Sequence, residues 1–179
     1  GIDMLGIAAT NIIFPIVTIC TAVALLFGVG GASNFNIKMG EGDRQTAAFI
    51  AGNSITMLLI IGAMIGVVQL VFASPLLNLL GATPGVMNFA MPYTIITAFG
   101  VPFLVFSTGA SHLIRADSSP RYAMFSILAG AIFNLVFDPI FLFVFKMGIS
   151  GIALATTLGQ MLSFCISGHY IWKKFCTVE

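Results

Sequence analysis

Asp138 is an acidic residue deep within an apolar stretch of the sequence, where a carboxyl group can do chemistry. Asn134 precedes it by four residues and therefore lies on the same face of a helix. An Asp placed at the centre of a membrane helix costs at least about 2.5–3.5 kcal/mol on insertion scales. We therefore expect this carboxyl group to face a bundle interior or a wet cavity, and to be protonated part of the time.

Pro139 adds a third oxygen to the same patch. Proline has no backbone N–H, so it leaves the carbonyl of Leu135 without its usual helical donor and favours a kink at this point. The carboxylate of Asp138, the amide of Asn134 and this carbonyl would together bind a proton or a small hard cation such as Na⁺. The alternative is a structural carboxylate that is hydrogen-bonded to neighbouring helices.

Further polar side chains are predicted to lie at a similar depth. Thr156 follows Gly148 by eight residues and Asp138 precedes Lys146 by eight, which places each about 12 Å from the same surface. Tyr93 and Asn11 lie about 9 Å from that surface, and Gln160 is one turn beyond Thr156. We expect these side chains to line one pocket: Asp138, Asn134, Thr156, Tyr93, Asn11 and Gln160.

Each of these additional residues also has a purely structural interpretation. The Thr156 hydroxyl can bond back to its own helix, as membrane threonines often do. Tyr93 can be an interfacial anchor. Asn11 and Gln160 can hold neighbouring helices together by hydrogen bonds.

The composition indicates that the elements that position these residues are membrane helices. The chain has 179 residues, of which 59% are hydrophobic and only 13 carry a formal charge, with a mean hydropathy of +1.08. A soluble domain is usually about one-quarter charged. This excludes a soluble enzyme, a nucleic-acid binder and a disordered region, and the net charge of +1 implies no strongly charged partner.

Gaps between charged residues predict how many helices there are. A spanning helix needs about 20 apolar residues. No charge occurs between Asp3 and Lys38, between Arg44 and Arg115, or between Lys146 and Lys173. The second gap contains Pro and Gly breakers and accommodates two helices. The predicted fold is all-α, a polytopic bundle with spans at about 5–32, 47–73, 87–114, 120–145 and 149–172.

Basic residues predict the orientation. Six of the seven Lys and Arg fall in segments that five alternating spans place on one side, and only Lys146 falls on the other. The positive-inside bias makes the six-residue side cytoplasmic. The prediction is therefore an integral protein of the cell membrane, plasma or inner, whose loops 33–46 and 115–121 and C-terminus are cytoplasmic. Gly1–Asp3, the 74–86 turn and Lys146–Gly148 are then extracytoplasmic.

No pattern in the sequence supports catalysis. There is no nucleophile constellation, phosphate loop or pair of carboxylates, and the three cysteines lack metal or redox spacing. We expect no enzyme activity and no cofactor other than a coupling ion. The chain begins with Gly1 and shows no signal peptide, so we expect it to be a piece of a longer protein.

Several segments resemble the amino-terminal half of multidrug and toxic compound extrusion (MATE) transporters. The resemblance covers the whole chain and depends on the order and spacing of three segments: Lys38-Met39-Gly40-Glu41-Gly42-Asp43, Arg115-Ala116-Asp117-Ser118-Ser119-Pro120, and Asn134-x-x-x-Asp138-Pro139 followed by residues 147–156. It implies that the five helices are the second to sixth of a twelve-helix protein. The missing first helix and carboxy-terminal lobe of the same chain would then be partners.

The resemblance also implies a function. Such proteins export cationic and other amphipathic compounds by alternating access of two six-helix lobes, driven by H⁺ or Na⁺. Asn134 and Asp138 match the family's fifth-helix ion-site members, and Tyr93 and Thr156 match fourth- and sixth-helix members. The family's first-helix carboxylate is missing here. Serines and a threonine near Ser107, Thr108 and Ser111 replace its usual fourth-helix asparagines, and Ser111 is a further candidate for the cavity lining.

The resulting hypothesis is a secondary-active multidrug or cation efflux antiporter coupled to H⁺ or Na⁺. Asp138 would accept the proton or cation, Asn134 and Thr156 would ligate or tune it, and Tyr93 would shape the pocket. Small amphipathic or cationic compounds and membrane lipid would be its partners, with no nucleic acid. Two alternatives stay open: a flippase of similar fold for lipid-linked oligosaccharides or precursors, and a non-transporting membrane scaffold or receptor segment.

Overall fold

A computed structural model describes residues 2–173 and 175, with side chains from Ala8 onward. The described residues form an all-α structure: α1 (Ile2–Gly40), α2 (Arg44–Val71), α3 (Ala73–Leu79), α4 (Pro84–Ala116), α5 (Pro120–Pro139), the π-helix η1 (Ile140–Val144) and α6 (Ile149–Lys173). Within that part of the chain, five segments are long and apolar enough to cross a membrane. The predicted all-α fold class with five spans is confirmed.

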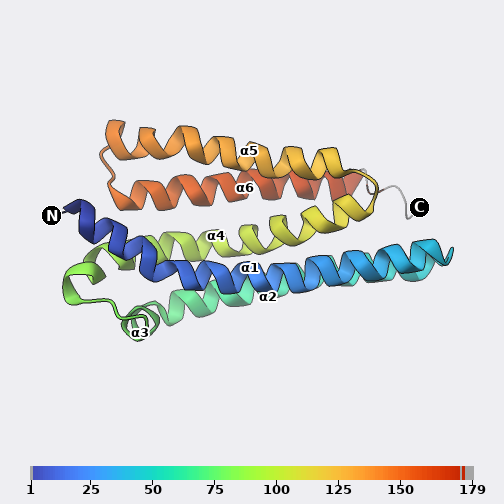
Figure 1. The fold of residues 1–179 in the computed structure, drawn as a ribbon, viewed down its shortest axis with the longest axis horizontal. Helices are drawn as coiled ribbons and strands as arrows, with labels where there is room; N and C mark the ends of the chain where they lie inside the picture. The colour runs from blue at the N-terminus through green and yellow to red at the C-terminus, as the bar shows by residue number, and fades with distance from the viewer. Residues whose placement is uncertain (1, 174, 176–179) are drawn as a thin grey trace.

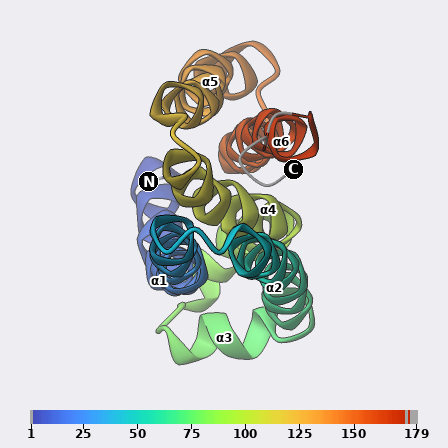
Figure 2. The same cartoon turned by 90° about the vertical axis from the view of Figure 1, so that its right-hand side faces the viewer.

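Helix α4 lies at the centre of the bundle. It packs against α1 and α2 on one side and against α6 on the other, and α5 is attached mainly through α6 (Figures 1 and 2). Its buried residues occur on several faces, whereas the buried residues of α5 are only Ala123, Ser126 and Gly130. The molecule therefore consists of an α1–α2–α4 group and an α5–α6 pair that meet at α4.

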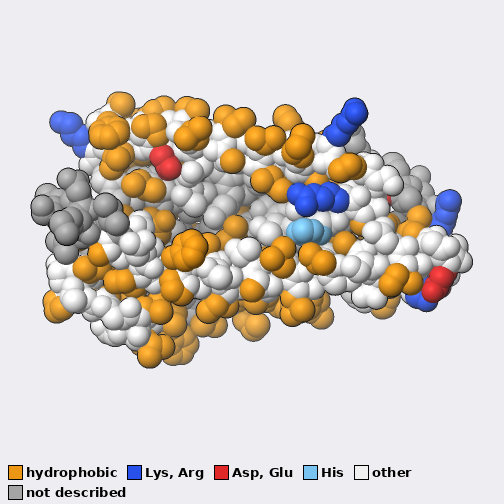
Figure 3. All heavy atoms as spheres, viewed as in Figure 1, with side chains coloured by type: hydrophobic (Ala, Val, Ile, Leu, Met, Phe, Trp, Pro, Cys, Tyr) orange, Lys and Arg blue, Asp and Glu red, His pale blue; other side chains and the backbone are white. Residues whose placement is uncertain are grey.

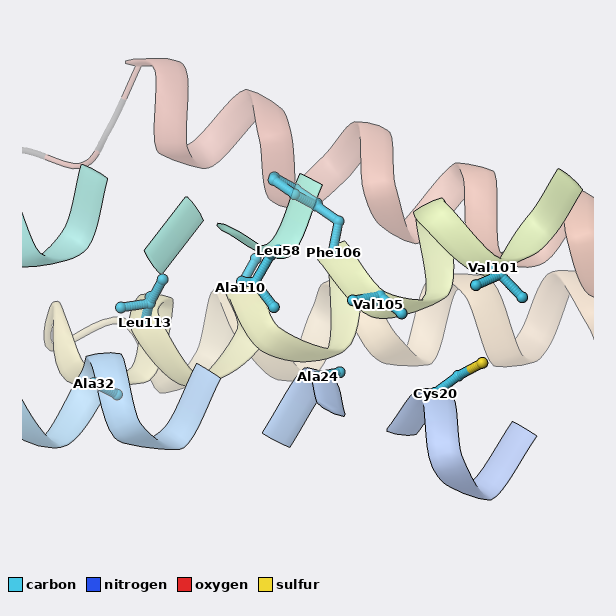
Figure 4. Packing of buried hydrophobic residues seen from close by; sticks show 9 residues of the cluster. All are labelled: Cys20, Ala24, Ala32, Leu58, Val101, Val105, Phe106, Ala110 and Leu113. Carbon is cyan, nitrogen blue, oxygen red and sulfur yellow. The ribbon is translucent and has the colours of Figure 1, made fainter. Parts of the chain in front are cut away.

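Small residues bring α1 and α2 close to α4. A Cβ added at Gly28 would lie 2.6 Å from the Cα of Gly109, so at this crossing the two backbones touch. Close approach of this kind is how helices associate in lipid, where no hydrophobic force drives them together. The same region holds the largest buried cluster, shown in Figure 4: Cys20, Ala24, Ala32, Leu58, Val101, Val105, Phe106, Ala110 and Leu113.

A second seam of small residues joins α5 to α6. A Cβ added at Gly130 would clash with the Ser163 hydroxyl and lie 2.6 Å from the carbonyl oxygen of Gly159. The Ser163 hydroxyl donates to the carbonyl of Ser126 (2.9 Å), and the Ser126 and Ser167 hydroxyls are 2.6 Å apart. Backbone contact and reciprocal serine bonds thus hold the two helices as one pair.

The helices differ from the predicted spans mainly at their ends. Helix α1 continues to Gly40, beyond residue 32, because a span estimate measures apolar length and not where a helix stops. The segment 74–86 is predicted to be a turn, yet most of the short helix α3 lies within it. At the α4–α5 turn, Ser119 is the N-cap but its side chain does not cap the helix. Its hydroxyl instead accepts a 2.6 Å bond from Tyr170.

Pro139 marks a change of helix type. The α-helical pattern of α5 ends at this residue and continues as η1, in which the Phe145 N–H reaches back five residues to the carbonyl of Ile140 (3.1 Å). π-helical turns of this kind occur mostly as single turns within or next to α-helices, where the regular i to i−4 hydrogen bonding is interrupted. The following turn uses positive φ at Lys146 (53°) and Gly148 (60°) to start α6.

On the face that Figure 3 displays, most charged side chains lie toward the two ends of the molecule, a basic and a His side chain lie right of centre, and one acidic side chain lies in the upper left part. The α1–α2 and α4–α5 connections and the end of α6 share one end of the molecule (Figure 1). Gly1, Lys174 and Cys176, which the orientation and cysteine arguments include, lie outside the described residues.

Candidate functional site

Asn134 connects the predicted ion-binding residues. Its Nδ2 donates to Oδ1 of Asp138 (3.2 Å) and to Oγ1 of Thr156 (3.0 Å). The first bond follows from the four-residue spacing along α5, and the second joins α5 to α6. The structure therefore brings three of the predicted residues together in one cluster, which we call the Asn134 cluster: Asn134, Asp138 and Thr156.

The chemistry of the three groups determines how the amide is oriented. An ionised carboxylate only accepts hydrogen bonds, so the amide must present its nitrogen to Asp138. Both Nδ2 hydrogens are used in these two bonds. The groups of the cluster that can still bind a ligand are therefore oxygens: the Asn134 side-chain carbonyl, the carboxylate and the threonine hydroxyl. Oxygens of these types are ligands for hard cations, and the carboxylate alone is also a proton acceptor.

The cluster borders a cavity between α4, α5 and α6. This cavity, which we call the α5 cavity, has a volume of about 340 Å³. Asn134 and Thr156 line it, and hydroxyl-bearing residues of α4 form the opposite wall. Its full lining is Leu104, Ser107, Thr108, Ile127, Gly130, Ala131, Asn134, Thr156, Gly159, Gln160 and Ser163.

A second cavity, which we call the α1 cavity, lies between α1, α2, α4 and α6 and has a volume of about 290 Å³. Tyr93 and Asn11 line this cavity and not the α5 cavity. Its full lining is Thr10, Asn11, Ile13, Phe14, Ile16, Val17, Cys20, Gln69, Tyr93, Thr97, Val101, Leu104, Thr156 and Gln160. The single pocket expected from depth is thus divided into two, and Asp138, which was expected to line it, is in neither lining.

Three residues belong to both linings: Leu104, Thr156 and Gln160. Gln160 has room there because α4 carries no side chain at Gly100. A Cβ at Gly100 would lie 2.5 Å from the Gln160 side-chain oxygen and 3.0 Å from the Thr157 hydroxyl. Thr157 in turn donates to the carbonyl of Ile96 (3.2 Å), which fixes α6 against α4 at this level.

Gln69 was missed by the sequence reasoning. It is 2% exposed near the end of α2, and its Nε2 lies 3.3 Å from both the Thr94 carbonyl and the Thr97 hydroxyl of α4. A glutamine within an uncharged apolar span was a usable signal, since polar side chains in membrane helices usually face the protein interior. It lines the α1 cavity together with Thr97.

Ser111 is buried and donates to the carbonyl of Thr108 in its own helix (2.7 Å). It belongs to the lining of neither cavity, whereas Ser107 and Thr108 line the α5 cavity. Among the described residues, no group of three or more His, Cys, Asp or Glu side chains comes together.

Comparison with known proteins indicates the family of this chain. The profile of the MatE family matches residues 3–140. The multidrug export protein MepA of Staphylococcus haemolyticus is 27% identical over 168 residues, which are 94% of this chain and 37% of that protein. The FAD transporter of Shewanella oneidensis is 25% identical over 178 residues, 97% of this chain and 39% of that protein.

Solved structures of similar fold are also transporters. The inward-facing conformation of a multidrug resistance MATE family transporter has a TM-score of 0.91 at 25% identity, covering 98% of this chain and 40% of that one. A MOP superfamily transporter from Pyrococcus furiosus, described as having a binding pocket of reversed polarity, has a TM-score of 0.87 at 26% identity, covering 99% and 40%.

These matches place the chain within a larger architecture. It spans less than two-fifths of the curated relatives, at 37% and 39% of their lengths. The family profile, in contrast, matches most of the chain, and the five apolar helices agree with the family's membrane fold. The protein is an integral membrane protein that belongs to the MatE family.

Proposed function

We propose that this chain is the ion-coupling portion of a secondary-active efflux antiporter that exports small amphipathic cations in exchange for H⁺ or Na⁺. The observation that carries the proposal is the Asn134 cluster at the edge of the α5 cavity, where a carboxylate within a membrane span has oxygen-bearing neighbours on two helices. Relatives named as multidrug export proteins support the cargo class.

Protonation of Asp138 would change the cluster in a defined way. A neutral carboxyl group gains an O–H donor and loses much of its attraction for the Asn134 amide. The Asn134 side chain is then less firmly held and can rotate, which would weaken its hydrogen bond to Thr156. Within this cluster, that bond is the described polar contact between α5 and α6. An ion moves the equilibrium between two packings only by as much as its affinity differs between them, so this local change is where the coupling free energy would arise.

Cation export is favoured over a phosphate-bearing cargo by the charge of the lining. Neither cavity lining contains Lys or Arg, and the nearby ionisable group is the acid of the Asn134 cluster. A lipid-linked pyrophosphate would need basic groups to balance its charge. The relative named as an FAD transporter has an anionic cargo by that name. The charged residues that line its cavities are therefore the first feature to compare with those of this chain.

The proposed orientation follows the positive-inside rule. The connections 41–43 and 117–119 and the end of α6 would face the cytoplasm, and the turn at residues 146–148 would face outward. The Asn134 cluster would then lie in the outer half of the membrane, within reach of protons or Na⁺ that enter from outside.

Replacing Asp138 with Asn in the complete protein tests the proposal. We expect ion-driven export of a cationic dye from vesicles to fall at least about tenfold, because the titratable group that couples ion to cargo is removed. Glu41→Gln is the matched control, since Glu41 is an exposed acid at the opposite end, paired with Lys38. Unchanged dye export and unchanged ion dependence in Asp138→Asn would remove Asp138 from the mechanism.

A further inference from the structure

Phe175 lies just beyond α6, whose last residue is Lys173. Its side chain is half-buried although it is not part of a helix. The ring packs against Phe35 of α1, with ring centroids 5.7 Å apart, and meets the ring of Tyr170 of α6 edge-on at 6.4 Å. Phe35 and Tyr170 are 1% and 4% exposed, so these two buried rings form a socket for Phe175, which we call the Phe175 socket.

The side chain of Phe175 also packs against clusters of buried residues from five helices. One cluster joins α1 to α2 and consists of Phe35, Ala47 and Ala51. Another joins α4, α5 and α6 and consists of Ile114, Ala123 and Tyr170. The third is the large cluster of α1, α2 and α4 that Figure 4 shows. A single side chain thus lies where all the long helices meet at one end of the bundle.

This contact connects two parts of the bundle that are otherwise joined through α4. Helix α6 packs mainly against α4 and α5, and α1 packs mainly against α4 and α2. Phe175 adds a direct connection from the end of α6 to α1 and α2. It lies at the end of the molecule where the α1–α2 and α4–α5 connections are also found (Figure 1).

The two sides of this contact are held in different ways. The Tyr170 hydroxyl oxygen lies 2.8 Å from Oδ2 of Asp117 and 2.6 Å from the Ser119 hydroxyl, and its ring packs on Tyr122 at 4.7 Å. These contacts fix one wall of the socket to the α4–α5 connection. The described contacts of Phe175 itself are ring and apolar contacts, which lose much of their attraction within about 1 Å of separation.

We propose that Phe175 is a latch that holds the end of α6 against α1 and α2. With the ring in the socket, the α5–α6 pair is attached to α4 and to the α1–α2 side. With the ring withdrawn, the pair is attached through α4 alone. A pull on the chain that follows α6 reaches Phe175 before it reaches the helix. Because α6 carries Thr156 and Gln160 in the wall of the α1 cavity, the latch limits how far that wall can move from α1.

Distances between spin labels, measured by pulsed EPR, test the latch in the complete protein without its native cysteines. Ile37→Cys on α1 and His169→Cys on α6, both at exposed positions, report the separation of these two helices. Ile37→Cys and Arg115→Cys on α4 report whether the α1–α2–α4 group is intact. In Phe175→Ala we expect the population at longer α1–α6 distances to grow at least about fivefold, because the ring contacts are lost, while the α1–α4 distances stay unchanged.

Trp172→Ala is the matched control, because Trp172 is a larger aromatic residue of the same helix end and is 85% exposed. Both distance distributions should be unchanged in this variant. Phe175→Leu keeps an apolar side chain and should lengthen the α1–α6 distances by less. It decides the test if Phe175→Ala does not fold.

Two results overturn the inference. One is an unchanged α1–α6 distribution when Phe175 is replaced in a folded protein. The other is equal broadening for both label pairs, which would show a general loss of packing and not the opening of a latch. The measurement uses neither cargo nor an ion gradient, so its outcome is independent of the proposed function.

Discussion

Asn134 is the residue on which both polar contacts of the proposed ion site depend. Its amide joins a carboxylate four residues later in α5 and a hydroxyl of α6. A hydrogen bond to an ionised group is roughly twice as strong as one between neutral groups, so the charge of Asp138 determines how firmly the amide is held. A single proton can therefore change an interhelical contact without any large movement.

Asp43 offers a pH test at the residue scale outside the membrane. Hydrogen bonds from Thr46, first from its hydroxyl and then from its backbone amide, lower the pKa of Asp43 below its ordinary value of 3.8, and its Oδ1 caps α2 at 3.1 Å from the Thr46 nitrogen. The cap is fully present above the ordinary pKa and is lost as the pH falls through the lower, folded-state value.

We therefore expect the amide protection of residues 44–47 in hydrogen exchange to decrease in acid, measured against intrinsic exchange at each pH. Asp43→Asn is the control, because Asn caps a helix about as well as Asp and does not titrate. A parallel acid-induced loss in Asp43→Asn would show that the carboxyl group is not the cause.

At the scale of elements, α5 and α6 form a closely packed pair. Its two helices are joined by backbone contact at Gly130 and Gly159 and by serine hydrogen bonds. The pair meets the rest of the bundle mainly through α6 on α4, where Thr157 and Gln160 pack at Gly100. Any shift of the pair against α4 would therefore have to rearrange the α4–α6 packing at Gly100, as in a shear motion of packed helices.

Gly130→Ala tests the seam. Its Cβ would meet a backbone carbonyl that cannot move aside, so we expect a loss of about 1–3 kcal/mol of stability and a lower thermal midpoint. Gly52→Ala is the control, since a Cβ at Gly52 meets nothing within 4 Å. Alanine has the higher helix propensity, so the control should be neutral or slightly stabilised. Equal destabilisation of the two variants would contradict close packing at Gly130.

At the scale of the whole molecule, α4 separates two cavities that the sequence had merged into one. The α5 cavity is lined by Asn134, which is hydrogen-bonded to Asp138, and the lining of the α1 cavity is uncharged and largely apolar. An amphipathic cation has the same division between a charged end and an apolar body. The two cavities formed around α4 thus correspond to the two parts of the proposed cargo, and no single residue provides this correspondence.

The orientation of the whole molecule is tested by labelling. In a background without the native cysteines, Met147→Cys, at a position that is 43% exposed, should react with a membrane-impermeant maleimide on intact cells. Glu41→Cys, at an exposed position in the α1–α2 connection, should react only after the membrane is permeabilised. The reverse pattern would invert the assigned orientation.

Much of the fold was predictable because lipid constrains sequence strongly. Long gaps between charged residues predict five spans, because a charge within lipid is costly. Each span must be a helix, because a helix pairs the backbone N–H and C=O groups of a single segment within lipid. The short helix α3 and the π-helix η1 were not predicted, because both depend on backbone hydrogen bonding in segments that hydropathy does not distinguish. The order and spacing of the sequence motifs predicted membership of the MATE family, and the match of the MatE family profile to residues 3–140 confirms it.

By itself, the sequence determined that Asn134 and Asp138 share a helix face, because a four-residue spacing brings side chains together in any α-helix. It also proposed Thr156 at the same depth, but the tertiary structure decided that Thr156 is the residue that bonds to Asn134 and that Tyr93 and Asn11 belong to a different cavity. It also placed Gln69 against α4. The physical reason is that contacts between helices depend on rotation and close approach, which small residues such as Gly100 and Gly130 set locally and which no periodicity along one helix encodes.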